Sequence, residues 1–335
     1  MTSSGRTPSI SVSGAFQAEA DTNYPAAAVP TIYFIGMTTG KSSIMKVFPK
    51  WAEYLGLGEV RIQGIDCRWH DAPAVYRRIV EHIKRDRLSL GALVTTHKLD
   101  LLNACREMFD ELDEYAELLS EISCLSKRDG RLRGSAKDPI TSGLALEAFL
   151  PADHWRKTGG EVCLLGAGGS SLALTMYLMQ TVPPPQRPRT IRVTNRSVPR
   201  LDEMKHVHAR INPGLEVSYH HCPQPSDNDA VVAALPAGSL VANATGLGKD
   251  GPGSPLTDAA VWPANGLVWD FNYRGDLVFL DQARRAQASR NLQIEDGWIY
   301  FIHGWTRVVA DVFACDIPTR GPTFDRISEI AAAAR

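Results

Sequence analysis

A glycine-rich segment, residues 161–173, is the part of this sequence whose residue types most directly indicate chemistry. Its apolar run VCLL leads into a turn and then into an apolar helical pattern; the turn residues are Gly166, Ala167, Gly168, Gly169 and Ser170. Gly166 permits a tight turn, and Gly168 lets the backbone approach a pyrophosphate at the helix N-terminus. The third position of the dinucleotide fingerprint holds Ser171 instead of glycine, so the motif alone also fits a plain strand–helix turn.

The end of the next predicted strand, TIRVTN, indicates which dinucleotide is bound. Asn195, Arg196 and Ser197 stand where an NAD enzyme carries a carboxylate for the ribose hydroxyl. This chain offers Arg196, with Arg200 nearby, and no acid before Asp202. Because a guanidinium pairs well with the 2′-phosphate, we expect NADP as the cofactor.

A second nucleotide-binding pattern lies near the N-terminus. TIYFIGMTTGKSS places Gly40 and Lys41 after a predicted strand, as a P-loop does. The glycine that a P-loop requires five positions earlier is replaced by Ile35, and Gly36 falls one residue late. Asp270, after LVW, resembles a Walker B acid. A P-loop nucleotide-binding protein is therefore an alternative that the spacing disfavours.

Histidines raise the alternative of a metal site. His206 and His208 form an H-x-H pair, and His220, His221 and Cys222 cluster further on. Both groups fall in the predicted dinucleotide-binding half, on a polar helix and a strand end, where a partly exposed structural role explains them. We therefore predict no metal.

Composition excludes several classes of protein. Lys and Arg number 36 against 37 Asp and Glu, so no overall basic field attracts a nucleic acid. Six cysteines without C-x-x-C spacing, and an N-terminus without a signal-like apolar stretch, predict reduced thiols in a cytoplasmic protein. The uncharged stretch 162–186 holds three glycines and three prolines, which indicates a strand, a turn and a buried helix, not a membrane span.

The alternation of apolar runs with amphipathic stretches predicts two successive α/β units with largely parallel sheets. In the first unit, we expect strands at TIYFIG, VRIQGID and LGALVTT, and a hairpin around Asp129-Gly130. Helices are expected there at 43–55, 74–84 and, as one or two helices, 100–119. In the second unit, the expected strands are EVCLL, TIRVTN, LEVSYHH, SLVANATG and GLVWDFNY, and 297–313 and 324–334 are expected to be terminal helices.

Several motifs occur in one order, and through them the chain resembles the shikimate dehydrogenase family. They are VTTHK (94–98), DGRLRGSAKD (129–138), LLGAGGSSLA (164–173), TNRS (194–197), NATGLG (243–248), VWDFNY (268–273) and DGWIYFIHG (296–304). The Ser, Gly and Pro content of the N-terminus predicts a disordered tail over 1–30. The resemblance implies a substrate-binding catalytic domain over 31–150 and a Rossmann-type NADP-binding domain over 151–295. It also implies C-terminal helices, 296–335, that return to pack on the substrate domain.

The resemblance also implies individual site residues. The family's catalytic lysine matches Lys98 and its catalytic aspartate matches Asp138, a pair that can protonate the oxygen of a ketone under reduction. The implied substrate contacts are Ser42, Thr95, Ser123, Tyr273 and His303. Further cofactor contacts are implied at Asn243, Ala244 and Thr245.

The substrate-binding positions depart from the family pattern. Ile44 replaces the second of two serines that grip the substrate carboxylate, and Ala92 and Ala136 replace asparagines. Ser123 and His303 stand at an asparagine and a glutamine position. Losing such groups lowers selectivity for a substrate hydroxyl, so we expect a less hydroxylated or amino-bearing ring, with shikimate and quinate kept as candidates.

The predicted function is hydride transfer between NADP(H) and a small cyclic hydroxy or keto acid, without nucleic-acid or membrane partners. The alternative is a catalytically impaired NADP-binding sensor or pathway partner. Lys98 and Asp138 argue against that alternative, and the lost amides argue for it. The sequence leaves the substrate, the direction of reaction and the oligomeric state open.

Overall fold

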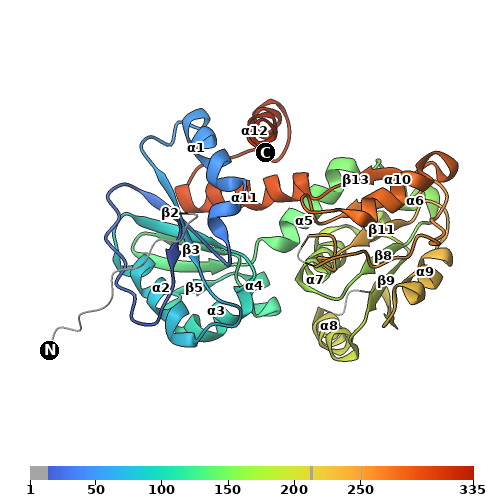
Figure 1. The fold of residues 1–335 in the computed structure, drawn as a ribbon, viewed down its shortest axis with the longest axis horizontal. Coiled ribbons are helices and arrows are strands. Elements are labelled where there is room, and N and C mark those ends of the chain that lie inside the picture. The colour runs from blue at the N-terminus through green and yellow to red at the C-terminus, as the bar shows by residue number, and fades with distance from the viewer. Residues whose placement is uncertain (1–13, 212–213, 250) are drawn as a thin grey trace. The chain divides into compact units, whose positions relative to one another are not determined.

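The computed structural model describes residues 14–211, 214–249 and 251–335. They form two compact α/β units (Figure 1), which confirms the predicted fold class. Unit 1 contains the chain up to Lys137 together with 304–335, and unit 2 contains 138–303. The chain thus enters unit 2 at the start of one helix and returns to unit 1 inside another.

Unit 1 is built on a seven-stranded sheet. Its strands are β1 (Phe16–Gln17), β2 (Thr31–Gly36), β3 (Arg61–Asp66), β4 (Ser89–Val94), β5 (Glu111–Leu112), β6 (Cys124–Arg128) and β7 (Arg131–Ser135). Their order is β1-β3-β2-β4-β6-β7-β5. The first four strands pair in parallel, whereas β6 is antiparallel to both β4 and β7. The predicted hairpin joins β6 to β7, and Asp129 and Gly130 have φ values of 51° and 76°, as a type I′ turn requires.

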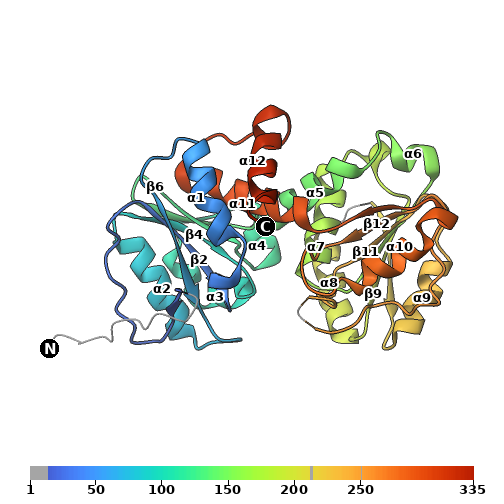
Figure 2. The same ribbon diagram turned by 45° about the horizontal axis from the view of Figure 1, so that its top comes forward.

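Helices cover this sheet and bring the C-terminal segment onto it. They are α1 (Ile44–Tyr54), α2 (Pro73–Arg85), α3 (Lys98–Cys105), α4 (Glu114–Leu119), the second half of α11 (Trp298–Phe313), α12 (Pro322–Ala332) and the short turns η1 (Thr39–Lys41) and η2 (Arg106–Met108). Figure 2 shows α12 beside α1, where Trp51 Nε1 donates to the Ile327 carbonyl at 2.9 Å. Trp305 of α11 packs edge-on against Phe34 of β2, with ring centroids 5.0 Å apart. Both contacts fix the C-terminal segment within unit 1.

The prediction of a disordered tail over 1–30 is wrong for residues 14–30; residues 1–13 lie outside the described part of the chain. The strand β1 pairs in parallel with β3, and Ala15, Ala18 and Tyr24 are buried. Arg78 Nε donates to the Thr22 carbonyl at 2.9 Å. Few apolar residues are enough to order this segment, because the edge of β3 has backbone groups that need hydrogen-bond partners.

Two other boundaries differ from the sequence-based expectation. The helical segment expected over 100–119 is divided by the short strand β5, and its first helix already begins at Lys98. The helix α5 (Asp138–Phe149) belongs to unit 2, not to the first domain, because Ala145 and Leu146 are buried in the core of unit 2. Gly143 allows α5 to pack closely against Tyr177, because a Cβ at this position would lie 2.3 Å from the Tyr177 ring. The return crossing falls between His303 and Gly304, inside α11.

Unit 2 contains a six-stranded parallel sheet. Its strands are β8 (Val162–Leu165), β9 (Thr190–Asn195), β10 (Glu216–His221), β11 (Leu240–Asn243), β12 (Leu267–Asp270) and β13 (Gln293–Glu295). Their order is β10-β9-β8-β11-β12-β13, with every neighbouring pair parallel. This is the strand order of a doubly wound dinucleotide-binding fold in which β8 is the first strand.

Helices lie on both faces of this sheet, as successive strand residues point to opposite sides. Leu164 and Val193 pack in one core with α5, α7 (Gly169–Met176) and α8 (Val198–Ile211). Leu165 and Val268 pack in the other with α9 (Pro225–Ala233) and α10 (Val278–Arg290). The remaining short helices of unit 2 are α6 (His154–Thr158), η3 (Tyr177–Thr181) and η4 (Pro184–Gln186). The sheet therefore has two buried faces, which explains its almost uninterrupted apolar strands.

Two further sequence-based expectations can be compared with the structure. The uncharged stretch 162–186 folds as β8, a turn, α7 and short helical turns, and no described helix is long and apolar enough to cross a membrane. All six cysteines are free thiols, and five of them are buried. Burial raises the pKa of the Cys105 thiol, of Cys124 and of Cys163 to about 12, so these groups stay protonated and unreactive at neutral pH.

A buried histidine joins three elements of unit 2. His208 of α8 contacts Thr175 Oγ1 of α7 through Nε2 at 2.8 Å and the Tyr219 hydroxyl of β10 through Nδ1 at 2.6 Å. Thr175 Oγ1 already donates to the Leu172 carbonyl, so it accepts from Nε2–H, and Tyr219 donates to Nδ1. This pattern needs a neutral ring, and burial lowers the pKa of His208 to about 4.

We expect His208 to make the protein acid-labile. Because its folded-state pKa lies below the ordinary value of 6.5, the unfolded chain takes up the proton first as the pH falls. The stabilisation is complete above pH 6.5 and is lost down to about pH 4, a change of about 3 kcal/mol. The measurement is urea unfolding of the wild type and His208→Gln across this range. The difference between their unfolding free energies should grow with pH, and a constant difference would contradict the assignment.

Candidate functional site

The predicted substrate residues of unit 1 follow strand ends at one edge of its sheet. Thr95 comes directly after β4, and its N–H donates to the Ile35 carbonyl of β2 at 3.0 Å. Lys98 opens α3 three residues further, and its carbonyl accepts from the Ile122 N–H at 3.3 Å. The loop after β4 is therefore tied on one side to β2 and on the other to the segment before β6.

The segment before β6 is in turn tied to the end of β7. Ser123 Oγ accepts from the Lys137 N–H at 2.8 Å, and the Ser123 N–H donates to the Ser135 carbonyl at 3.0 Å. Asp138 is the next residue along the chain and the first of α5. Within unit 1, strand pairing therefore brings the segment that ends at Lys137 to the same sheet edge as the loop that carries Lys98.

A buried carboxylate holds the loop that carries Ser42. Asp66, the last residue of β3, accepts from the N–H and the hydroxyl of Thr39 at 2.8 and 2.6 Å. Gly64 allows this approach, because a Cβ there would lie 2.2 Å from Thr39 Oγ1. The Ser42 N–H then bonds to the Thr39 carbonyl at 3.0 Å. Asp66 was not predicted as a site residue, and its only signal in the sequence is an acid that ends an apolar strand.

This loop does not have the properties of a P-loop. A P-loop needs free backbone N–H groups that converge on a phosphate. Here the Thr39 N–H donates to Asp66, the Lys41 N–H to the Thr38 carbonyl and the Ser42 N–H to Thr39. These donors are already satisfied within unit 1, so the geometry argues against the nucleoside-triphosphate alternative.

The VTTHK segment is held rigidly. Thr96 has φ = 61°, a left-handed conformation that is strained for a β-branched residue. The next residue, His97, is buried, and its Nδ1 lies 3.1 Å from the Tyr76 hydroxyl. Burial lowers the pKa of His97, so the ring is neutral at neutral pH. The turn thus presents Lys98 from a fixed backbone.

Three of the positions that depart from the family pattern contribute to the core. Ile44, Ala92 and Ala136 are almost completely buried within unit 1. Their side chains carry no hydrogen-bonding group, so they cannot replace the polar contacts that a serine or asparagine would make. These three positions therefore cannot supply the polar contacts that the family pattern implies there.

The glycine turn of unit 2 has the geometry of a dinucleotide site. Gly166 has φ = 104°, and a Cβ there would lie 3.1 Å from the Ala244 carbonyl oxygen. At Gly168, in contrast, a Cβ would meet nothing closer than 3.9 Å, which leaves open space in front of the N-terminus of α7. Gly169 is exposed and Ser170 is half-buried beside it. An anion could therefore approach these backbone N–H groups closely.

Ser171, at the third fingerprint position, has a structural role. It is fully buried, and its hydroxyl donates to the Gly166 carbonyl. It therefore stabilises the turn from the inside. The turn residues that reach the surface are Gly168, Gly169 and Ser170, which precede it.

The end of β9 lies against the same turn and carries a free guanidinium. Asn195 Oδ1 accepts from the Ala167 N–H at 3.4 Å, while its Nδ2 donates to the Ser197 carbonyl at 3.0 Å. Arg196 is exposed, and no carboxylate among the described residues pairs with it. Arg200 instead forms an ion pair with Glu203 on its own helix. Of the two arginines, Arg196 is therefore the one free to bind a phosphate.

A second buried carboxylate holds the loop after β11. Asp270, at the end of β12, accepts from Asn243 Nδ2 at 3.1 Å and from the Asn272 N–H at 2.9 Å. Asn243 Oδ1 accepts in turn from the N–H and the hydroxyl of Thr245 at 3.1 and 2.7 Å. Burial raises the pKa of Asp270 to about 6. From the sequence, Asp270 was considered only as a Walker B acid, and its role in positioning this loop was missed.

The remaining predicted residues lie on or near α11. Tyr273 follows β12 and packs against Trp298 and Phe301, with ring centroids 5.3 and 4.8 Å apart. His303 is buried on the same helix, at the end of unit 2. The predicted substrate and catalytic residues are thus divided between the units: Ser42, Thr95, Lys98 and Ser123 belong to unit 1, and Asp138, Tyr273 and His303 to unit 2.

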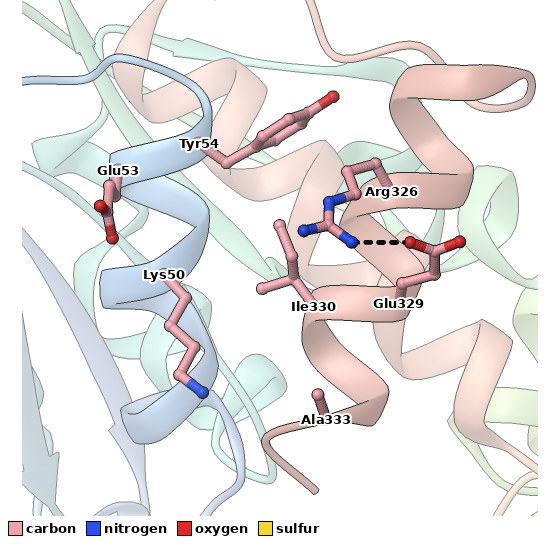
Figure 3. Close-up of a pocket in the computed structure, with 7 residues that line it drawn as sticks. All are labelled: Lys50, Glu53, Tyr54, Arg326, Glu329, Ile330 and Ala333. Atoms are coloured by element: carbon pink, nitrogen blue, oxygen red, sulfur yellow. Dashed lines mark hydrogen bonds and ion pairs between the residues drawn. The ribbon is translucent and has the colours of Figure 1, made fainter.

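Two other features carry no part of the predicted site. A groove of about 490 Å³ between α1 and α12 is lined by side chains of both charges, and Arg326 and Glu329 pair across 2.8 Å within it (Figure 3). In the described part of the chain, no group of three or more His, Cys, Asp or Glu side chains could hold a metal ion. His208 is committed to Thr175 and Tyr219, and His220 lies 2.9 Å from Ser218 Oγ.

The chain is similar in sequence to several curated proteins. The chain is 25% identical to the shikimate dehydrogenase (NADP+) of Methylocella silvestris over 288 residues, which span 86% of this chain and 92% of that relative. Four further curated relatives have the same name. The resemblance to the shikimate dehydrogenase family is confirmed. No protein-family model matches the chain.

Solved shikimate dehydrogenase-like structures share the fold. Shikimate 5-dehydrogenase from Thermus thermophilus, in complex with NADP(H) and shikimate, has a TM-score of 0.65 at 19% identity and covers 91% of this chain and 99% of its own. Quinate dehydrogenase from Corynebacterium glutamicum, in complex with NAD, has a TM-score of 0.68 at 18% identity with the same coverage. At these identities the likeness concerns the fold, and it agrees with the two α/β units described above.

The open space at Gly168 allows a direct test of the cofactor turn. We expect Gly168→Val to abolish NADPH binding, because the branched side chain fills the position of the pyrophosphate. The backbone φ of −88° and the absence of close neighbours mean that the variant should fold. NADPH fluorescence measures binding, and thermal unfolding serves as the control for folding. Binding that survives in a folded variant would show that the turn is only structural.

Arg196 provides a separate test of cofactor choice. Arg196→Ala should weaken NADPH binding by about tenfold or more and leave NADH binding nearly unchanged, because only NADPH carries the 2′-phosphate. Arg200→Ala is the matched control, since Arg200 already pairs with Glu203. Dissociation constants for both cofactors distinguish the two variants, and equal losses for NADPH and NADH would refute the assignment.

Proposed function

We propose that this protein is an NADP-dependent oxidoreductase that transfers hydride between NADP(H) and a small cyclic hydroxy or keto acid. The observation that carries the proposal is the cofactor turn of unit 2, with its open approach at Gly168 and the exposed guanidinium of Arg196, which pairs with no carboxylate in the described part of the chain. The six free thiols support a cytoplasmic location.

The relatives support both the enzyme class and the cofactor. All five curated relatives are named NADP+ shikimate dehydrogenases, and the solved structures of this fold include an NADP(H) complex. The acid that an NAD enzyme places at the end of the second Rossmann strand is absent from this chain, which has Arg196 there. The quinate dehydrogenase of the same fold is described with NAD, so the arginine is the specific argument for NADP.

The residues present fit such a cofactor. The N-terminus of α7, behind Gly168, Gly169 and Ser170, would hold the pyrophosphate, and Arg196 the 2′-phosphate. Asn243, Ala244 and Thr245 would line the opposite side of the turn, where the Ala244 carbonyl already lies next to Gly166. When bound, the nicotinamide supplies or accepts the hydride.

The proton chemistry falls to Lys98 and Asp138. Ketone reduction places negative charge on the carbonyl oxygen, and an ammonium group within reach can donate a proton to it. Lys98 is half-buried and presented from the VTTHK turn, while Asp138 begins α5 three residues after the end of β7. In this proposal Asp138 orients Lys98 and shares its proton. Oxidation of the alcohol runs through the same groups in reverse.

The proposed substrate has fewer ring hydroxyls than shikimate. Ile44, Ala92 and Ala136 are buried and apolar, so the corresponding polar contacts are lost. Ser42, Thr95, Ser123, Tyr273 and His303 remain as polar candidates for substrate contact. They suffice for a carboxylate and one reacting oxygen, and they leave additional hydroxyls with fewer partners. Shikimate and quinate are therefore expected to be poor substrates.

Substitution of the lysine tests the mechanism. Lys98→Ala should lower kcat by about 10²–10⁴-fold, the usual contribution of a general acid–base group, while the NADPH dissociation constant stays the same. Asp138→Asn should lower kcat less, because an amide can still orient the lysine. Steady-state kinetics with a panel of cyclic keto acids provide the measurement.

The control is Lys50→Ala, which removes an exposed lysine of α1 in the same unit and should leave kcat unchanged. Near-normal turnover by Lys98→Ala would overturn the mechanism. A wild-type protein that binds NADPH but reduces no member of the panel would instead favour the alternative of an NADP-binding sensor.

A further inference from the structure

Exposed apolar side chains gather at the sheet edge that carries the predicted substrate residues of unit 1. Met37 directly follows β2 and is 42% exposed, Trp69 follows β3 and is 61% exposed, and Leu99 follows Lys98 and is 44% exposed. They are three of the six large apolar side chains that are exposed in the described part of the chain. Single exposed apolar residues are common, but a concentration at one edge indicates a binding surface.

The three side chains start from neighbouring strand ends. In the sheet, β2 lies between β3 and β4, all three are parallel, and Gly36 pairs with Asp66 while Ile35 pairs with Val94. The strands therefore end nearly level. The loops after them leave the sheet at the same edge, and the loop after β2 also carries Ser42.

Polar contacts tie the Trp69 loop to the first turn of α3. His70, which has φ = 49°, lies 2.9 Å from Asp100 Oδ2 through Nδ1. The Asp71 N–H donates to the Tyr76 hydroxyl at 3.2 Å, and that hydroxyl lies 3.1 Å from His97 Nδ1. Both contacts join this loop to the segment 97–100, which carries Lys98 and Leu99.

We propose that Met37, Trp69 and Leu99, here called the apolar rim, select a cyclic keto or hydroxy acid with a hydrophobic alkyl or aryl substituent. This inference rests on the proposed function and specifies its substrate class. The carboxylate and the reacting oxygen lie toward Ser42 and Lys98, and the substituent lies against the rim. Polar groups are also missing at Ile44, Ala92 and Ala136 of the same unit, and this loss favours a less polar substrate as well.

The free energies of burial and desolvation favour such a substituent over additional hydroxyls. An aryl group that leaves water to contact the Trp69 ring gains from burial and from ring–ring packing. A hydroxyl in the same position would lose its water contacts without a donor or acceptor from the rim. We expect a preference of about tenfold for the aryl-bearing acid.

The experiment compares an oxo-cyclohexene carboxylic acid with its phenyl-substituted and hydroxylated derivatives. Calorimetry on the protein saturated with NADP+ gives the dissociation constants, and NADPH oxidation gives KM and kcat. The phenyl derivative should bind about tenfold more tightly than the parent acid, and the hydroxylated derivative no more tightly. Trp69→Ala and Leu99→Ala should abolish the preference and leave the binding of the parent acid unchanged. Tyr54→Ala, which removes an exposed aromatic ring from α1, should retain it.

The readouts separate this inference from the proposed function. If the phenyl preference in binding holds while NADPH reduces no acid, the proposed function fails and the apolar rim stands. If the parent acid is reduced but the phenyl derivative binds no better, the rim inference is wrong and the function stands. An unchanged preference in Trp69→Ala and Leu99→Ala, or a wild-type oligomer that dissociates in Trp69→Ala, would also overturn the rim assignment.

Discussion

The pairing of parallel strands is the constraint on which the candidate site depends. In a parallel sheet all carboxyl ends lie at one edge, so loops that are distant in sequence leave the sheet side by side. In unit 2 this places the turn after β8 next to the loop after β11, with Ala244 against Gly166. In unit 1 it places the loops after β2, β3 and β4 together, and the antiparallel β6 and β7 add the segments at Ser123 and Lys137 to the same edge.

Each unit strengthens its edge with a buried carboxylate at a strand end. Asp66 accepts two hydrogen bonds from Thr39, and Asp270 accepts from Asn243 and Asn272. Burying a carboxylate is costly unless donors satisfy it, so these contacts allow few alternative loop conformations. The raised pKa of Asp270 shows that the cost of burial is only partly offset by its donors. The buried carboxylates therefore fix the loops at the sheet edges that carry the candidate site.

In the proposed function, the same edge allows substrate choice to change while the proton chemistry is kept. Lys98 is positioned by the backbone of the VTTHK turn, which depends on His97, Tyr76 and the strand pairing beneath it. Ile44, Ala92 and Ala136, at positions where the family pattern has polar side chains, belong to the core of unit 1. In the proposed function, the exposed apolar residues Met37, Trp69 and Leu99 would replace the lost contacts, so that specificity and proton transfer would depend on different residues.

The sequence by itself determined the local elements and the cofactor turn. The Asp129-Gly130 hairpin, the glycine turn at 166–170 and the strands from TIYFIG to GLVWDFNY, apart from the two-residue β5, were predicted, because periodicity, turn residues and the fingerprint are short-range properties. The family resemblance added the matched positions Lys98 and Asp138, which no short-range pattern distinguishes from ordinary surface charges.

Only the tertiary structure decided which distant residues hold these elements in place. The roles of Asp66, Asp270 and Ser171 could not be assigned from the sequence, because each role depends on a partner brought close by the fold. The ordered structure of residues 14–30 and the assignment of α5 to unit 2 were missed for the same reason. The edge of β3 that pairs with β1, and the space at Gly143 that the Tyr177 ring fills, exist only in the folded chain. Residues that are adjacent in sequence do not reveal them.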